Sequence, residues 1–195
     1  MAKGVLSDRE KALEESYFRQ HDAKLLEKLR QRAGLDDIAT ALAEKLHVEN
    51  PALLARARKV GVTADTAAAF LLAPLVQIAW AEGSVGKRER AAVLRLALER
   101  GVPDGTPAHA QLVRWLEERP DDALFDTALE CLEAGLAVLP PKERDERLEQ
   151  IADACREVAE ASGTVVARLI GLGNGVSSSE ASILDTICKR LRGRR

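Results

Sequence analysis

Residues 78–101, IAWAEGSVGKRERAAVLRLALERG, contain the pattern that decides the fold. The stretch begins as an apolar, alanine-rich run and reaches a turn between Gly83 and Gly86. Leucine, valine and alanine then recur at helical spacing until Gly101. This periodicity is typical of an amphipathic helix, and glycine commonly follows the end of a helix. The segment therefore predicts two helices that are joined by a tight turn.

A second copy of this pattern lies near the C-terminus, as VAEASG at 158–163 and GVSSSEASILDTICKRLRG at 175–193. In both copies an apolar helix ends in Ala-x-Gly, a turn follows, and a Val precedes a Glu by four residues. The corresponding pairs are Val85–Glu89 and Val176–Glu180. An insertion at 164–174 separates the two parts of the second copy. We expect two related helix–turn–helix units that pack about a pseudo-twofold axis and bury both apolar faces.

The rest of the chain also predicts helices. Hydrophobic residues make up 46% of the sequence and charged residues 31%, and alanine, leucine, glutamate, lysine and arginine favour helix over strand. Capping residues, prolines and glycines place helix boundaries. The expected helices span 7–32, 36–47, 51–61, 63–80 with a break at Pro74, 87–100, 107–119, 122–138, 141–161 and 178–191. We predict an all-α fold: a compact bundle of about eight to nine helices with an internal duplication, plus a long charged N-terminal helix. Residues 1–33 form the arm and 34–195 the domain.

Composition and charge indicate which kinds of partner and which cellular location to expect. The net charge of −2 gives no general bias toward nucleic acid. The longest apolar stretch, 67–81, contains Pro74 and Gln77 and is short for a membrane span. No apolar leader follows the first methionine. We expect a soluble cytoplasmic protein without a transmembrane segment, whose contact with any membrane complex is peripheral. Its three cysteines have no metal-ligand spacing and are expected to be reduced thiols that face the core.

The motif AEGSVGKRE, residues 81–89, resembles the hallmark of TerB-like domains, a helical family named after a tellurite-resistance protein. The hallmark is Ala-Asp-Gly-x-Ile/Val with a Glu four residues later, and it occurs twice in the family. The resemblance covers roughly residues 36–192. It implies a bacterial helical domain that works by binding, in a stress- or envelope-linked complex.

TerB-like turns also suggest a metal site. Acidic residues in these turns are associated with divalent metal, so Glu82, Glu89 and Glu180 are candidate ligands for an ion such as calcium. Calcium takes about six to eight oxygen ligands, and three carboxylates from turns that need not converge supply few of them. The alternative is that Glu89 and Glu180 cap the N-termini of their helices. We expect no cofactor, with calcium as the alternative.

The N-terminal run REKALEESYFRQHDAKLLEKLRQR, residues 9–32, holds two of the six aromatic residues side by side. It is similar to the inhibitory helix of the mitochondrial ATP synthase inhibitor protein, which enters a catalytic interface of the rotary ATPase. The matching residues are Arg9, Glu10, Ala12, Glu14, Glu15, Tyr17, Phe18, Arg19, Leu26 and Leu29. The long coiled coil of that family is absent here, because Gly34 ends the helix and the helical domain follows.

Two interpretations of this arm are open. Phe18 lines up with Leu25 and Leu29 on a helix, so the apolar surface is broad but sparse among charges. It either docks on the chain's own domain or binds a partner in a helix-in-groove mode, a second copy included. The residues predicted to bind the partner are Arg9, Glu10, Glu14, Glu15, Tyr17, Phe18, Arg19, Leu26 and Leu29.

No catalytic constellation is present in the sequence. The three histidines are far apart, and the glycine-rich stretch near residue 172 lacks the strand and the Lys-Ser/Thr pair of a phosphate-binding loop. We therefore expect no enzyme, but a TerB-like interaction protein whose arm docks a partner or self-associates. The alternatives are a regulator of a rotary ATPase that acts through residues 9–29 and a divalent-metal-binding protein.

Overall fold

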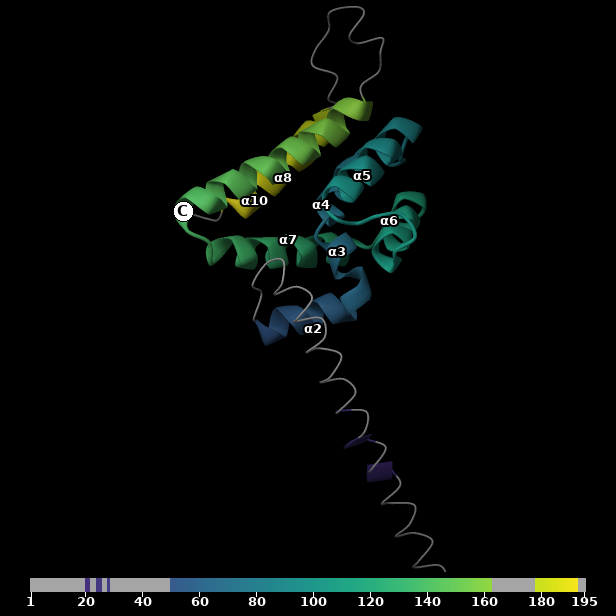
Figure 1. The fold of residues 1–195 in the computed structure, drawn as a ribbon, viewed down its shortest axis with the longest axis vertical. Coiled ribbons are helices and arrows are strands. Elements are labelled where there is room, and N and C mark those ends of the chain that lie inside the picture. Colours follow the sequence, from purple (N-terminus) through teal and green to yellow (C-terminus); the bar gives the residue numbers. More distant parts are fainter. Residues whose placement is uncertain (1–19, 22–23, 26–27, 29–49, 163–177, 193–195) are drawn as a thin grey trace, which may run out of the picture.

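The computed structural model describes residues 20–21, 24–25, 28, 50–162 and 178–192 (Figure 1). These residues form eight α-helices and one 3-10 helix and contain no strand, which confirms the all-α prediction. The elements are α2 (Pro51–Lys59), η1 (Ala64–Thr66), α3 (Ala67–Phe70), α4 (Ala73–Ala79), α5 (Lys87–Glu99), α6 (Pro107–Glu117), α7 (Asp122–Ala137), α8 (Pro141–Ser162) and α10 (Ser178–Leu191). The expected helix at 36–47 and most of the arm lie outside the described residues. Five positions of the arm, 20, 21, 24, 25 and 28, are described and helical.

Side-chain caps set the start of three helices where the sequence predicts them. Asn50 Oδ1 accepts a hydrogen bond of 3.0 Å from the backbone N–H of Ala52 at the start of α2. Thr106 Oγ1 accepts one of 3.2 Å from the N–H of His109 in α6. Asp121 Oδ1 likewise caps α7. Each cap satisfies an N–H that has no partner inside its own helix, so these boundaries follow from local sequence.

The expected break at Pro74 is confirmed. The segment after Thr63 forms η1 and α3, turns at Leu71–Leu72, and resumes as α4 with Pro74 in its first turn. Proline is tolerated there because the first N–H groups of a helix have no intrahelical acceptor. Gly83 then makes the turn toward α5 with φ of 84°, a conformation that side chains with a Cβ rarely adopt.

The two copies of the helix–turn–helix pattern pack against each other. Helices α4 and α5 are the first copy, and α8 and α10 are the second. Helix α4 of the first copy lies against α8 of the second. The other two helices also pack on the opposite copy, α5 on α8 and α10 on α4, as expected for two related units that pack about a pseudo-twofold axis. Helix α7 runs below α8 and α10, and α2 lies on the other side of α7 (Figure 1).

One apolar core joins these helices. Phe70, Ile78, Leu112, Phe125 and Ile187 are among its largest fully buried side chains. Burying a side chain of this size contributes about 1.5–3 kcal/mol of hydrophobic free energy, so the core accounts for much of the stability of the bundle.

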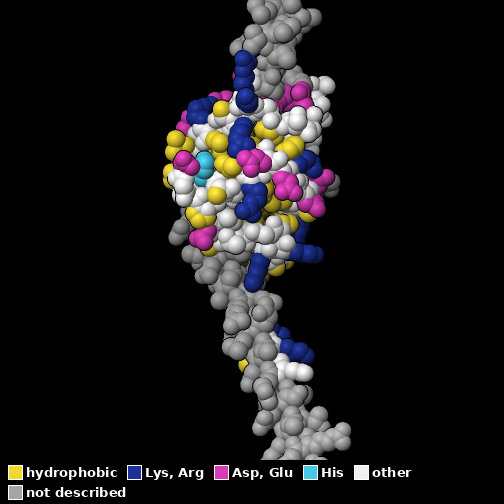
Figure 2. All heavy atoms as spheres, turned by 90° about the vertical axis from the view of Figure 1, so that its right-hand side faces the viewer, with side chains coloured by type: hydrophobic (Ala, Val, Ile, Leu, Met, Phe, Trp, Pro, Cys, Tyr) yellow, Lys and Arg dark blue, Asp and Glu magenta, His cyan; other side chains and the backbone are white. Residues whose placement is uncertain are grey.

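The tryptophans link α4 to α6. The indole N–H of Trp80 donates a hydrogen bond of 2.8 Å to the backbone carbonyl of Trp115. Trp115 is buried in the core, and the half-buried Trp80 packs against it. The exposed face in Figure 2 mixes cationic, anionic and apolar side chains, in keeping with the small net charge.

Candidate functional site

The arm presents an apolar side chain to solvent. Leu25 is 51% exposed, and the other described arm residues are exposed as well. The nine residues predicted to bind the partner, Arg9, Glu10, Glu14, Glu15, Tyr17, Phe18, Arg19, Leu26 and Leu29, lie outside the described residues. The sequence predicts that Phe18, Leu25 and Leu29 lie along one side of the arm helix. Of these three, Leu25 is described, and its side chain is exposed to solvent.

Glu89 caps α5. It is the third residue of the helix, and its Oε2 accepts a hydrogen bond of 2.5 Å from the backbone N–H of Gly86. A Cβ on Gly86 would lie 2.8 Å from the same oxygen, so the lack of a side chain at Gly86 allows this approach. Only 5% of Glu89 is exposed. The capping interpretation of Glu89 is therefore confirmed.

The three candidate metal ligands come closer together than the sequence suggests. Burial raises the pKa of Glu89, the hydrogen bond from Gly86 lowers it, and the charges of Glu180 and Glu82 raise it further. Glu180 is fully buried at the third position of α10, whereas Glu82 is exposed in the turn after α4. The charges of Glu180 and Glu82 both act on Glu89, so the carboxylates of these two residues lie within electrostatic reach of Glu89. Among the described side chains, no group of three or more His, Cys, Asp or Glu is arranged to hold a metal ion.

A groove of about 780 Å³ lies between the first half of α8 and the last half of α10. Its apolar lining comes from both helices, namely Leu148, Ile151, Ala152, Ile187 and Leu191. Four basic residues and two acidic residues also line it, namely Arg144, Arg156, Lys189, Arg192, Asp145 and Glu149. We call this the α8–α10 groove. No local sequence signal marks this groove, because the residues of its two walls are more than thirty positions apart in the chain and only the pairing of α8 with α10 brings them together.

A smaller groove of about 340 Å³ lies between α2 and α7, with Leu53, Ala134 and Ala137 in its lining. The guanidinium of Arg56 reaches across it to the carboxylate of Glu130. Arg190 of α10 also approaches Glu130 and pairs with Asp126 at 2.5 Å. These exposed ion pairs connect α2 and α10 to α7. Exposed pairs contribute about 0–1 kcal/mol each to the free energy of unfolding.

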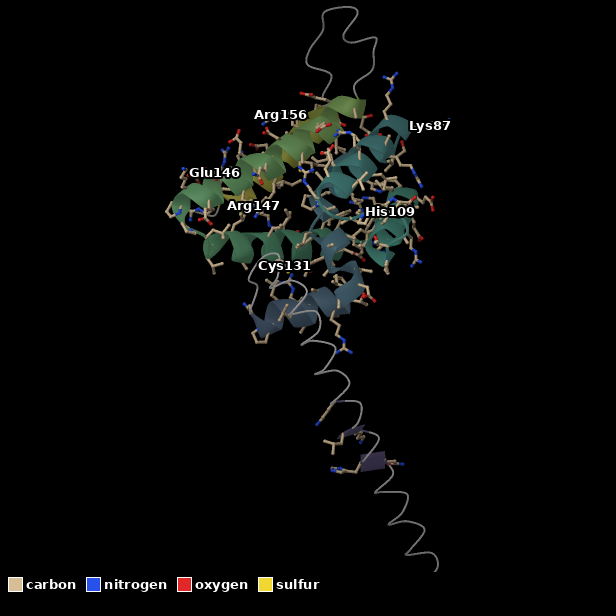
Figure 3. The ribbon with its side chains drawn as sticks, viewed as in Figure 1. Lys87, His109, Cys131, Glu146, Arg147 and Arg156 are labelled. Atoms are coloured by element: carbon tan, nitrogen blue, oxygen red, sulfur yellow. The ribbon has the colours of Figure 1, made fainter. Side chains whose placement is uncertain are left out.

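The thiols fall into two environments. Cys131 and Cys155 are buried, and burial raises the pKa of each to about 12. Cys188 is partly exposed and lines the α8–α10 groove, so the expectation of a core position is met only in part. Burial raises the pKa of Cys188 too, although the nearby Arg192 and Arg156 oppose that rise. Raised pKa values disfavour the thiolate form, which is the nucleophile, so none of the three resembles an activated cysteine. Figure 3 labels Cys131, a residue of α7, and Arg147 and Arg156 of α8.

The helices that the structure describes include none that is long and apolar enough to cross a membrane. Comparison with protein-family models, with curated proteins and with solved structures found no match to this chain. The TerB-like and inhibitor-like resemblances thus rest on the sequence motifs given above.

Proposed function

We propose that this chain is a non-enzymatic interaction protein, in which a TerB-like helical domain carries a helical arm that docks a partner or a second copy. The observation that carries the proposal is the exposure of Leu25 on the arm. On a helix, residue 18 lies seven positions before residue 25, so the aromatic pair Tyr17–Phe18 extends the same surface. Aromatic and arginine side chains are the common anchors of protein interfaces, and this stretch supplies both.

The perturbed ionisable groups of the domain have structural causes, which supports a binding role over catalysis. Shifted pKa values often mark active sites. Here the shift of Glu89 accompanies a helix cap, and the shifts of Cys131 and Cys155 follow from burial in the core. Neither arrangement pairs a nucleophile with a base, the minimum for covalent catalysis.

The arm's Glu14-Glu15-x-Tyr17-Phe18-Arg19 core favours one specific class of partner as the second candidate. Its similarity to the inhibitory helix of the ATP synthase inhibitor protein points to a rotary ATPase, which the arm would regulate. The TerB-like resemblance points instead to a stress- or envelope-linked complex. Either partner, the rotary ATPase or the stress- or envelope-linked complex, would bind the same surface of the arm. One experiment therefore distinguishes the two candidates by identifying the protein that binds.

The test is affinity purification of the tagged full-length chain from the cells that make it. The double variant Tyr17→Ala/Phe18→Ala removes both rings. Leu98→Ala is the matched control, because Leu98 is 59% exposed on α5 and outside the arm. We expect proteins that the wild type and the control retain to be lost with the double variant. Equal retention by all three would refute the proposal. If ATPase subunits are retained, a peptide of residues 7–32 should slow ATP hydrolysis by that ATPase.

A further inference from the structure

Two of the three cysteines lie on the helices that form the α8–α10 groove, Cys155 on α8 and Cys188 on α10. The two helices pack against each other and run in opposite directions (Figure 1). The α8 wall of the groove spans 144–156 and the α10 wall spans 187–192, so this antiparallel arrangement places Arg156 at the Cys188 end of the groove. Because Cys155 directly precedes Arg156 in the chain, both thiols are found at that end.

The electrostatic environment of the two thiols agrees with this placement. Burial is the main cause of the raised pKa of Cys155, and the charge of Cys188 raises it further. Burial also raises the pKa of Cys188, Arg192 and Arg156 lower it, and Glu149 of α8 raises it. Glu149 and Arg156 stand on either side of Cys155 in the chain. The part of α8 that influences Cys188 is therefore the part that carries Cys155.

The two thiols differ in their access to solvent. Cys188 is partly exposed and lines the groove, so a small oxidant that enters the groove meets Cys188 first. Cys155 has no exposed surface, so it reacts with a group formed on a neighbouring side chain more readily than with a dissolved oxidant. Cys131 is buried on α7, where Glu130 and Arg56 act on it, and it serves as the control thiol.

Two packed helices can hold cysteines at the separation that a disulfide requires. The Cα atoms of a disulfide lie about 4.4–6.8 Å apart. Packed helices have axes about 8–10 Å apart, and each Cα lies about 2.3 Å from its own axis. Residues that face each other across such a pair therefore reach the required separation.

Helix α10 has few buried side chains to hold it in the bundle. Its buried residues are Glu180, Ile187 and Leu191, whereas α7, which is similar in length, has nine. Elements with few buried contacts open at a lower free-energy cost than the rest of a domain. A covalent bond from the last turn of α10 to α8 would restrict this opening.

We propose that hydrogen peroxide converts Cys188 and Cys155 into a reversible disulfide that links α10 to α8. The sulfur of the Cys188 thiolate attacks one peroxide oxygen, the O–O bond breaks, and a sulfenic acid forms while the other oxygen leaves as water. The sulfur of Cys155 then attacks the Cys188 sulfur. The S–S bond forms, and the hydroxyl leaves with the proton of the Cys155 thiol as a second water. The two thiols together lose two electrons and two protons, which reduce the peroxide to two molecules of water.

The rate of the first step depends on how much of Cys188 is ionised. Because the thiolate is the nucleophile and burial disfavours it, Cys188 should react more slowly than a cysteine whose pKa is lowered. The disulfide is therefore a response to sustained oxidation. A thiol reductant reverses it by attack on the partly exposed sulfur of Cys188.

Peptide mapping of the oxidised full-length chain tests the proposal. The reduced protein is treated with hydrogen peroxide, the remaining thiols are alkylated in denaturant, and the chain is digested with trypsin without reductant. We expect a disulfide between the peptides 148–156 and 169–189, with Cys131 alkylated. Cys131→Ser should form the same cross-link, Cys155→Ser and Cys188→Ser should lack it, and a reducing dithiol should remove it. If Cys155→Ser does not fold, the wild-type map still identifies the linked pair directly.

Thermal unfolding measures what the bond does to the domain. The disulfide closes a loop of more than thirty residues, so oxidation should raise the midpoint of the wild type by about 5 °C or more and leave that of Cys188→Ser unchanged. Four results would each overturn the proposal: oxidation that stops at a sulfenic or sulfinic acid on Cys188, a disulfide between two chains, a link to Cys131, or a cross-linked protein whose midpoint does not rise. The arm takes no part in this reaction, so the proposed function keeps its own test.

Discussion

Glu89 and Glu180 occupy the same position in the two helix pairs, and both are buried. Each is the third residue of its helix, α5 or α10, with exposed fractions of 5% and 0%. The charge of Glu180 raises the pKa of Glu89, so the two helix N-termini lie close enough to influence each other. The two copies of the pattern thus also correspond in space, through the buried glutamates at the N-termini of α5 and α10.

Replacing Glu89 by Gln should change how stability depends on pH. The folded protein holds the proton of Glu89 more tightly than the unfolded chain, because its pKa is raised above the ordinary value of 4.5. The free energy of unfolding therefore falls as pH rises from 4.5 through the raised pKa of Glu89, because the carboxyl group ionises less readily in the folded protein than in the unfolded chain. Glu89→Gln keeps an acceptor oxygen for Gly86 and carries no charge, so its stability relative to wild type should increase across that window.

Urea denaturation between pH 4 and pH 8 measures this difference, where the limits of about 4 and 8 bracket the titration of a carboxyl with a raised pKa. Glu143→Gln is the control, because Glu143 is exposed in the first turn of α8. It should show no comparable gain. If the free energies of unfolding of Glu89→Gln and wild type differed by the same amount at every pH, this would contradict the raised pKa of Glu89.

Gly86→Ala should destabilise the domain through Glu89. The new Cβ would lie 2.8 Å from Glu89 Oε2, so the end of the Glu89 side chain must shift, which disturbs the hydrogen bond that it accepts from the Gly86 N–H. We expect a loss of about 1–3 kcal/mol in the free energy of unfolding, as for other overpacked sites. In a Glu89→Ala background the collision is absent, so the same substitution should cost clearly less. A double-mutant cycle by denaturant unfolding checks this, and strict additivity of the two substitutions would be the contrary result.

The thiols should react in two classes. Cys131 and Cys155 are buried with pKa values of about 12, whereas Cys188 is partly exposed in the α8–α10 groove. A thiol reagent at pH 8, below the ordinary thiol pKa of about 8.5, should therefore modify one cysteine rapidly in the native chain and all three after denaturation. Cys188→Ser should remove the rapid phase, while Cys131→Ser should leave it. Two rapid thiols in the native protein would disagree with the described core.

Calcium should neither bind nor stabilise the domain. One oxygen of Glu89 already accepts the Gly86 N–H, and the described side chains supply no cluster of metal ligands. A protein that binds calcium only when folded gains stability in proportion to the logarithm of its concentration. Thermal unfolding with calcium and with a chelator should therefore give the same midpoint. A higher midpoint in calcium that Glu89→Gln abolishes would restore the metal alternative.

The sequence predicts the helices well because their boundaries depend on neighbouring residues. Asn50-Pro51 and Thr106-Pro107 are a cap followed by a proline at the first helical position, and Pro74 marks a break, so each signal acts within one turn. The capping role of Glu89 is likewise local, since its partner Gly86 is three residues away.

Features that depend on packing could not be predicted in the same way. The interaction of Glu180 with Glu89 requires the two helix pairs to pack together, which periodicity alone does not specify. The α8–α10 groove requires residues of two distant helices to face each other. The partial exposure of Cys188 follows from that groove, because the side of α10 that carries it is not fully covered by α8.

The central claim is that the aromatic pair of the arm carries the binding function. Quantitative comparison of the proteins retained by the wild type, Leu98→Ala and Tyr17→Ala/Phe18→Ala tests it most directly, with the chain's own second copy counted among them through a differently tagged version. We expect Leu98→Ala to retain every protein that the wild type retains, and the double variant to retain at least one of them about tenfold less or weaker still. Equal retention by the double variant and the wild type would contradict it.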